Sequence, residues 1–64
     1  MIEVGQLRRW TYAGRDHDKL FLVLEHTPFV ISPDLTDDGW TIMDSVGEPY
    51  WEVTEHIEAS SEPV

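Results

Sequence analysis

The chain contains no cysteine, few cations and no long hydrophobic run. Without cysteine, its 64 residues can form neither a disulfide nor a thiolate metal site, which excludes small disulfide scaffolds and zinc ribbons. No N-terminal stretch combines a charged start with the apolar core of a signal peptide, and no run is long enough to span a bilayer. We therefore expect a cytoplasmic protein with no membrane contact and no cofactor.

Positive charge is scarce and confined to the start of the chain. The four cations all lie within the first nineteen residues, whereas ten of the thirteen carboxylates follow Leu20, and the formal net charge is −9. Nucleic-acid affinity depends on cations that neutralise phosphates, so direct binding to DNA or RNA is not expected. The acidity serves either solubility or attraction to a basic protein surface, and both interpretations stay open.

Aromatic and aliphatic residues must supply the core. A chain of this length forms one small domain and buries only about 60% of the surface that its unfolded form exposes. Three Trp, two Tyr and two Phe are present, and each buried aromatic ring removes roughly 150–250 Å² from water. Packing of these rings can stabilise a small fold without cross-links.

The longest apolar run, Leu20 to Leu24, predicts a central β-strand buried on both faces, with Val23 fully buried. Further strands are predicted at residues 5–12, 29–31, 40–43 and 51–57, because these segments are rich in β-branched and aromatic residues or alternate in polarity. Residues 13–18 and 44–50 are expected to be loops, and Asp38-Gly39 is the strongest hairpin signal in the chain. No helix of useful length is predicted.

Five short strands joined by Gly, Pro and Asp turns predict an all-β fold. We expect a small, strongly bent, five-stranded antiparallel barrel over residues 1–57, because closure protects edges that so short a chain cannot otherwise cover. Residues 58–64 have the composition of an acidic flexible tail.

The strand pattern resembles the small SH3-like β-barrel proteins of tailed bacteriophages. The resemblance covers most of residues 4–57 and rests on four segments: Val4-Gly5-Gln6-Leu7-Arg8, Leu22-Val23-Leu24-Glu25, Gly39-Trp40-Thr41-Ile42 and Trp51-Glu52-Val53-Thr54. Two departures are present: Gln6 and Arg8 replace the usual Asp and Val, and Leu20-Phe21 stands where glycine is common. The resemblance implies an SH3-like fold and a viral origin, but it assigns no activity.

Motifs for metal binding and catalysis are absent. The Asp16-His17-Asp18 cluster lacks the spacing of metal ligands. The serines have no nucleophile elbow, and the glycines are isolated rather than gathered in a phosphate-binding loop. A barrel of this size is also expected to lack a substrate pocket of several hundred Å³. We therefore expect neither catalytic nor metal-ligating residues, and no enzyme.

The aromatic residues exceed what so small a core can hide. Trp40 and Trp51 begin strands and are expected in the core. Tyr12, Phe29 and Tyr50 border loops and are expected to be exposed. Exposed aromatics are enriched at protein interfaces, so we predict a protein-binding surface made of Tyr12, Phe29 and Tyr50 with the nearby carboxylates Asp44 and Glu48. The alternative, in which Tyr12 and Tyr50 merely cap the ends of the barrel, stays open.

Three functional hypotheses follow. The first is a non-enzymatic, phage-encoded module that binds a host or phage protein with a basic surface, in the host cytoplasm. The second is a virion component, such as a capsid decoration or connector subunit, in which the cationic start and acidic remainder of the chain suit head-to-tail contacts in an oligomer. The third is an acidic mimic that occupies the nucleic-acid site of a host enzyme.

Overall fold

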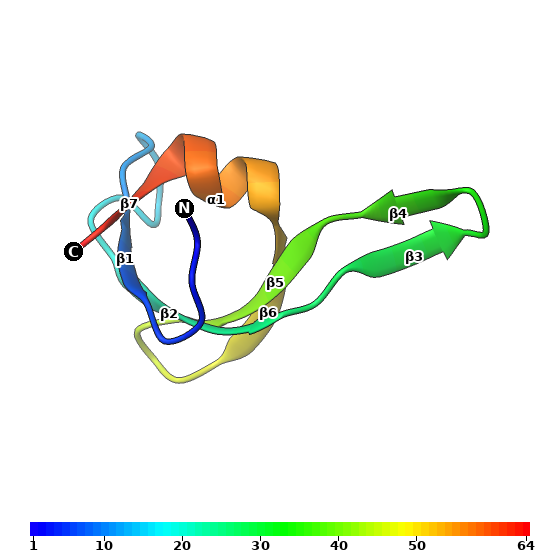
Figure 1. Cartoon of the computed structure of the whole chain (residues 1–64). Coiled ribbons are helices and arrows are strands. Elements are labelled where there is room, and N and C mark those ends of the chain that lie inside the picture. The colour runs from blue at the N-terminus through cyan, green and yellow to red at the C-terminus, as the bar shows by residue number, and fades with distance from the viewer.

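The computed structural model describes all 64 residues and contains seven strands and one short helix (Figure 1). The elements follow the chain as β1 (Leu7–Trp10), β2 (Leu20–His26), β3 (Phe29–Ser32), β4 (Leu35–Asp37), β5 (Gly39–Met43), β6 (Pro49–Val53), α1 (Thr54–Ser60) and β7 (Ser61–Pro63). Five strands form an antiparallel sheet in the order β6-β5-β2-β1-β7, and β3 and β4 form a separate two-stranded hairpin. The structure is therefore mostly β, with the predicted five-stranded antiparallel sheet, but the prediction of an all-β fold is wrong because residues 54–60 form α1.

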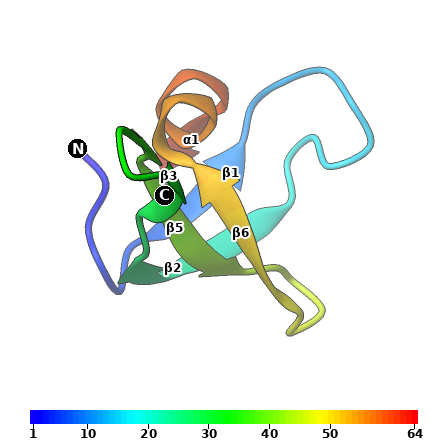
Figure 2. The same cartoon turned by 90° about the vertical axis from the view of Figure 1, so that its right-hand side faces the viewer.

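The five-stranded sheet is strongly curled. α1 connects β6 at one edge of the sheet with β7 at the opposite edge. Its seven residues rise only about 10 Å, whereas the outer strands of a flat five-stranded sheet lie about 19 Å apart. The two edges must therefore curve toward each other, as Figures 1 and 2 show. No ladder joins β6 to β7, so the predicted closed barrel is not formed, and α1 lies across the open side.

The core lies inside the curl and consists of Ile2, Trp10, Phe21, Val23, Ile42 and Ile57. Burial along β2 alternates: Phe21 and Val23 are buried, whereas Leu20 and Leu22 are exposed. The prediction that the leucine-rich run is buried on both faces is therefore wrong, although Val23 is fully buried as predicted. The curled sheet protects only its inner face, because its outer face has no second layer to cover it.

The C-terminal segment is ordered, and the prediction of a flexible tail is wrong. The strand predicted over residues 51–57 ends at Val53, and α1 follows and places Ile57 in the core. β7 then pairs antiparallel with β1. Ser61 is buried beside Arg8, whose Nε donates a hydrogen bond of 2.8 Å to the Ser61 Oγ. The domain therefore extends past residue 57. The helix is not long or apolar enough to cross a membrane.

The β3–β4 hairpin projects from the end of the sheet (Figure 1). It gives the molecule its elongated dimensions of 37 × 21 × 21 Å. The chain reverses between Ser32 and Leu35, which are paired across the hairpin. Asp38-Gly39, predicted as a hairpin turn, instead connects β4 with β5, which belong to different sheets. Gly39 is required there for space, since a Cβ at this position would overlap the Trp51 indole ring.

Candidate functional site

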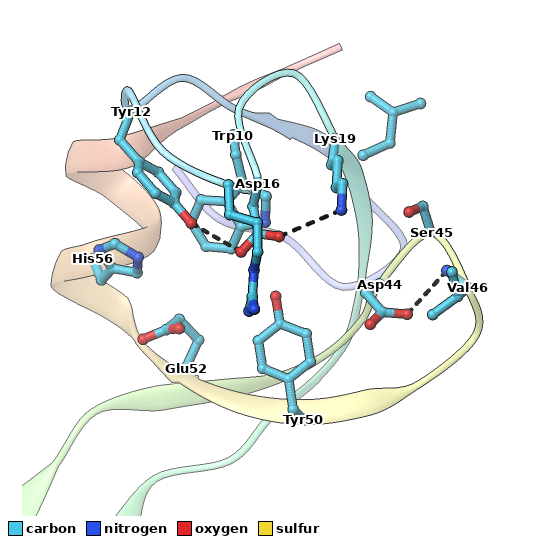
Figure 3. A pocket seen from close by; sticks show the side chains of 12 residues that line it. Trp10, Tyr12, Asp16, Lys19, Asp44, Ser45, Val46, Tyr50, Glu52 and His56 are labelled. Carbon is cyan, nitrogen blue, oxygen red and sulfur yellow. Dashed lines mark hydrogen bonds and ion pairs between the residues drawn. The ribbon is translucent and has the colours of Figure 1, made fainter.

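A hollow of about 340 Å³ opens between the β1–β2 loop, the β5–β6 loop and the junction of β6 with α1 (Figure 3). Its volume lies at the lower end of the range of ligand-binding pockets. The expectation that so small a fold has no room for such a pocket is therefore wrong. The hollow is formed by the two loops at the surface and not by the interior of the sheet.

One wall of the hollow is aromatic. Trp10 is buried and stacks on Phe21 with ring centroids 4.3 Å apart, which fixes the indole from behind. The Tyr12 ring meets the Trp10 ring edge-on at 5.6 Å, and the His56 ring lies 5.1 Å from Trp10. Tyr50 faces this group from β6 (Figure 3). The aromatic wall therefore combines the Trp10 ring, which is fixed by packing in the core, with rings such as Tyr50 that are in contact with solvent.

Carboxylates and cations also line the hollow. Asp16 accepts a hydrogen bond of 3.0 Å from the Tyr12 hydroxyl and lies 3.8 Å from the Lys19 Nζ. Asp44 and Glu52 take part in no ion pair. Of the lining cations, Lys19 is thus engaged with Asp16, whereas Arg15 forms no ion pair. The hollow keeps two carboxylates that a cation from another molecule could neutralise.

The phenols that border the hollow are harder to ionise than a free tyrosine. Desolvation and the hydrogen bond to Asp16 raise the pKa of Tyr12. Burial raises the pKa of Tyr50. Both side chains are therefore neutral hydrogen-bond donors near neutral pH, and both present uncharged ring faces to the hollow.

The structure brings three of the five predicted site residues together, because Tyr12, Asp44 and Tyr50 all line the hollow. Glu48 lies in the same loop as Asp44, and its backbone N–H donates to the Asp44 Oδ1 at 2.9 Å, but Glu48 does not line the hollow. Phe29 lies apart on the hairpin, with its ring centroid 6.0 Å from that of Trp51.

The sequence analysis missed other members of the wall: Trp10, Asp16, Glu52 and His56. Their positions in the sequence gave no signal, because the curl of the sheet and α1 bring together segments that are far apart in the chain. The prediction that Trp51 is buried in the core is also wrong. Trp51 is exposed on β6, whereas Trp40 packs against the core and is partly buried.

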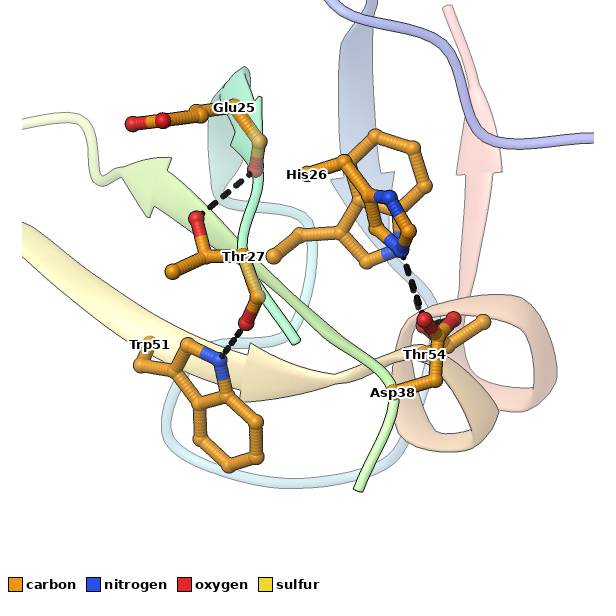
Figure 4. A network of polar contacts seen from close by, with 7 residues as sticks. Glu25, His26, Thr27, Asp38, Trp51 and Thr54 are labelled. Carbon is orange, nitrogen blue, oxygen red and sulfur yellow. Dashed lines mark hydrogen bonds and ion pairs between the residues drawn. The ribbon is translucent and has the colours of Figure 1, made fainter. Parts of the chain in front are cut away.

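A second polar group lies at the base of the hairpin (Figure 4). The Asp38 carboxylate lies 2.6 Å from the His26 Nε2 and accepts a second hydrogen bond from the Thr54 hydroxyl. Thr54 Oγ1 in turn accepts a hydrogen bond of 2.8 Å from the Trp40 Nε1. These contacts connect both ends of the hairpin with the start of α1.

This group contains a hydroxyl, a carboxylate and an imidazole, but their order does not suit nucleophilic catalysis. A catalytic hydroxyl must lie next to the imidazole that accepts its proton. Here the Thr54 hydroxyl contacts the carboxylate, and His26 lies beyond it. The hydrogen bonds from Thr54 and His26 lower the pKa of Asp38, which makes this carboxylate a weaker base. The group is suited to holding the hairpin in place.

Nowhere in the chain do three or more His, Asp or Glu side chains gather closely enough to hold a metal ion. In the Asp16-His17-Asp18 segment, His17 Nδ1 lies 3.0 Å from the Tyr12 carbonyl oxygen and its Nε2 lies 3.4 Å from the Asp18 carboxylate. These contacts organise the β1–β2 loop.

Comparison of the chain with protein-family models, with curated protein sequences and with solved structures gives no match.

Proposed function

We propose that this chain is a non-enzymatic protein-binding module that accepts a lysine or arginine side chain of a partner protein in the hollow between Tyr12 and Tyr50. The observation that carries the proposal is the combination of aromatic rings with Asp44 and Glu52, two carboxylates without ion-pair partners. A cation over an aromatic face gains about 0.5–2 kcal/mol. The carboxylates add electrostatic attraction that steers a basic partner to the hollow.

The charge of Arg15 makes the proposal testable by a single substitution. This residue lines the same hollow, and its charge opposes the entry of another cation. If the ligand is cationic, loss of the Arg15 charge must strengthen binding. If the ligand is anionic, the same loss must weaken binding. The sign of this single effect distinguishes the two kinds of ligand.

The proposed module is an SH3-like domain of phage origin. Support for the fold comes from the path of the chain, in which β1, β2, β5 and β6 form a meander and β7 returns to β1 across the short helix α1. The phage origin rests on the strand pattern of the sequence alone. The partner would be a host or phage protein in the infected cell.

The arrangement of cations weakens the alternative of a virion subunit with head-to-tail contacts. Arg8 is buried and hydrogen-bonded to Ser61, and Arg9 forms an ion pair with Glu62. These two cations are engaged within the chain and are poorly placed to attract a neighbouring copy. The hypothesis of a nucleic-acid mimic is still supported by the net charge of −9. It predicts that the chain competes with DNA or RNA for binding to the partner.

The test is an NMR titration of the isotopically labelled chain with the capped tripeptide acetyl-Gly-Arg-Gly-amide, with acetyl-Gly-Glu-Gly-amide as the control ligand. We expect saturable shifts of the amide signals of residues around the hollow with the first peptide only.

Three variants test the charges of the hollow. Glu52→Gln should weaken binding about three- to tenfold, which corresponds to about 1 kcal/mol. Arg15→Gln should strengthen it. The matched control is Glu25→Gln, an exposed carboxylate outside the hollow, which should change affinity less than twofold. Preference for the glutamate peptide, or weaker binding by Arg15→Gln, would overturn the proposal.

A further inference from the structure

The β3–β4 hairpin carries the largest group of exposed apolar side chains that are adjacent in the chain. Phe29 is 58% exposed, Val30 65%, Ile31 52% and Leu35 52%. The Trp51 ring of β6 lies beside Phe29, with ring centroids 6.0 Å apart, but the rest of the hairpin extends away from the sheet and from α1 (Figure 1). Side chains that stay this exposed contribute little apolar burial to folding. Contiguous exposed apolar surface of this kind marks interaction sites.

The apolar residues lie on both faces of the hairpin. Successive residues of a strand point to opposite faces, so Phe29 and Val30 cannot share one. Their cross-strand partners are Asp37 for Phe29 and Thr36 for Val30. A partner that covers one face therefore leaves an apolar side chain exposed on the other. Only a cleft that encloses the hairpin buries both.

The base of the hairpin is held in a fixed position. The Trp51 Nε1 donates a hydrogen bond of 2.7 Å to the Thr27 carbonyl, and the Thr27 N–H donates to the Gly39 carbonyl at 2.9 Å (Figure 4 shows the first of these). On the other strand, Asp38 is held by His26 and Thr54. An isolated two-stranded hairpin is only marginally stable in water. These contacts therefore organise the hairpin before a partner arrives, which lowers the entropy lost on binding.

The charge around the hairpin is exclusively negative. Between Leu20 and Val64 there is no Lys or Arg. A hollow of about 650 Å³ between the hairpin base and α1 is lined by Asp37, Asp38, Glu55 and Glu58. The tip of the hairpin carries Asp34. A complementary surface must therefore be basic around an apolar centre.

A second copy of the chain does not fit this description. Each copy has a net charge of −9, so two copies repel each other. Arg8 and Arg9 are engaged with Ser61 and Glu62, and Lys19 lies beside Asp16. Arg15 is the one cation without such a partner, and a single cation does not supply a basic rim.

We infer that the β3–β4 hairpin inserts into an apolar cleft of a different protein, with Lys or Arg residues around the rim of that cleft. The inference goes beyond the proposed function, because it concerns residues outside the hollow between Tyr12 and Tyr50. The two proposals fail independently, since substitutions in the hairpin leave the hollow intact.

The test is site-specific photo-crosslinking with the purified full-length chain in an extract of the source cells. Phe29 and Val30 are replaced in separate variants by p-benzoylphenylalanine. A third variant carries it at Val64, a 72% exposed apolar residue that lines neither hollow and lies at the end of the molecule away from the hairpin (Figure 1). We expect one protein to be crosslinked from both hairpin positions and not from position 64, through peptides that contain Lys or Arg. That protein, once purified, should bind Phe29→Ser and Val30→Ser at least tenfold more weakly, Val64→Ser within twofold, and all of them more weakly in high salt.

Several results would overturn the inference. Crosslinks from only one hairpin position would indicate a partner that covers a single face. A crosslinked dimer of the chain would indicate self-association, and the absence of any crosslink would indicate a hairpin without a partner. Thermal unfolding of the free variants provides the remaining control. If Phe29→Ser or Val30→Ser lowers the Tm by more than about 10 °C, these side chains support folding, and the inference is wrong.

Discussion

Arg8 and Ser61 are joined across 53 positions of sequence by a hydrogen bond of 2.8 Å from the Arg8 Nε to the Ser61 Oγ. The Arg8 Nη2 also donates to the Ser61 carbonyl oxygen at 3.0 Å, and both residues are buried. Burial lowers the pKa of the Arg8 guanidinium, which nevertheless stays charged at all ordinary pH values. A buried charge needs hydrogen-bond acceptors, and β7 supplies them to the Arg8 side chain of β1.

Deletion of Ser61–Val64 should therefore destabilise the fold. Hydrogen bonds to a charged group contribute about 1.5–3 kcal/mol, and the deletion also removes the ladder between β1 and β7. The total stability of a domain is only about 5–15 kcal/mol. We expect the Tm, measured by circular dichroism, to fall by more than about 10 °C. The control is Glu62→Gln, which breaks only the exposed ion pair with Arg9 and should cost less than about 1 kcal/mol. An unchanged Tm after the deletion would show that β7 is dispensable.

Two adjacent residues of β2 test the burial of its inner face. Val23 is fully buried, whereas its neighbour Leu22 is 36% exposed and points to the outer face. Val23→Asp places an unpaired charge in the core, at a cost of several kcal/mol that should unfold the chain. Leu22→Asp makes the same chemical change on the outer face and should leave a cooperative thermal transition. A similar Tm for both variants would contradict the alternation along β2.

The sequence predicted the strands of the sheet better than the end of the chain. In residues 51–57, Val53 and Ile57 lie four positions apart, a spacing that suits one face of a strand as well as one face of a helix. Alternation alone therefore could not exclude α1. The polar composition of residues 58–64 did not indicate that they form a strand of the sheet. Ser61 is buried there because it bonds Arg8, a residue distant in sequence.

The candidate site was predictable only in part. The position of aromatics beside loops identified Tyr12 and Tyr50, and the structure brings both to one hollow with Asp44. Tyr12 is nevertheless partly buried, and not exposed as predicted, because its ring packs against the core. No sequence spacing connects the β1–β2 loop with β6, since their proximity follows from the curl of the sheet. Phe29 was grouped with the tyrosines by residue type, but it belongs to the separate hairpin. Gly39 was interpreted as part of a hairpin turn, whereas the structure requires glycine there because a Cβ would overlap the Trp51 ring.

Acid should loosen the base of the hairpin through Asp38. Hydrogen bonds from Thr54 and His26 lower the pKa of Asp38 below its ordinary value. A carboxylate with a lowered folded-state pKa contributes stability above its unfolded-state pKa, and this contribution is lost as the pH falls through the folded-state value. The protection factors of the amides of residues 29–37, which correct for the intrinsic pH dependence of hydrogen exchange, should therefore fall on acidification below the ordinary pKa of aspartate, and Asp38→Asn should flatten this pH dependence. Asp34→Asn, at the hairpin tip, serves as the control and should leave the profile unchanged. Equal profiles for the wild type and Asp38→Asn would contradict the role of this carboxylate.

The last prediction uses the two tyrosines as reporters of the hollow. The chain contains only Tyr12 and Tyr50, so ultraviolet titration of Tyr50→Phe isolates Tyr12, and titration of Tyr12→Phe isolates Tyr50. Desolvation and the hydrogen bond to Asp16 raise the pKa of Tyr12, and burial raises that of Tyr50. Both phenols should therefore ionise at a higher pH than free tyrosine. Asp16→Asn should lower the pKa of Tyr12 toward the ordinary value, because a neutral amide no longer opposes the phenolate charge.

The same titration reports on the occupant of the hollow. A cation bound between the rings stabilises a nearby phenolate, so saturating acetyl-Gly-Arg-Gly-amide should lower the pKa of Tyr50. The glutamate peptide should not lower it. The Arg15→Gln variant should show a larger decrease at a given peptide concentration, because it binds the cation more tightly. A rise in the pKa of Tyr50 on addition of the arginine peptide would show that the peptide buries the phenol without placing its charge beside it, and the hollow would then be an apolar contact and not a site for cations.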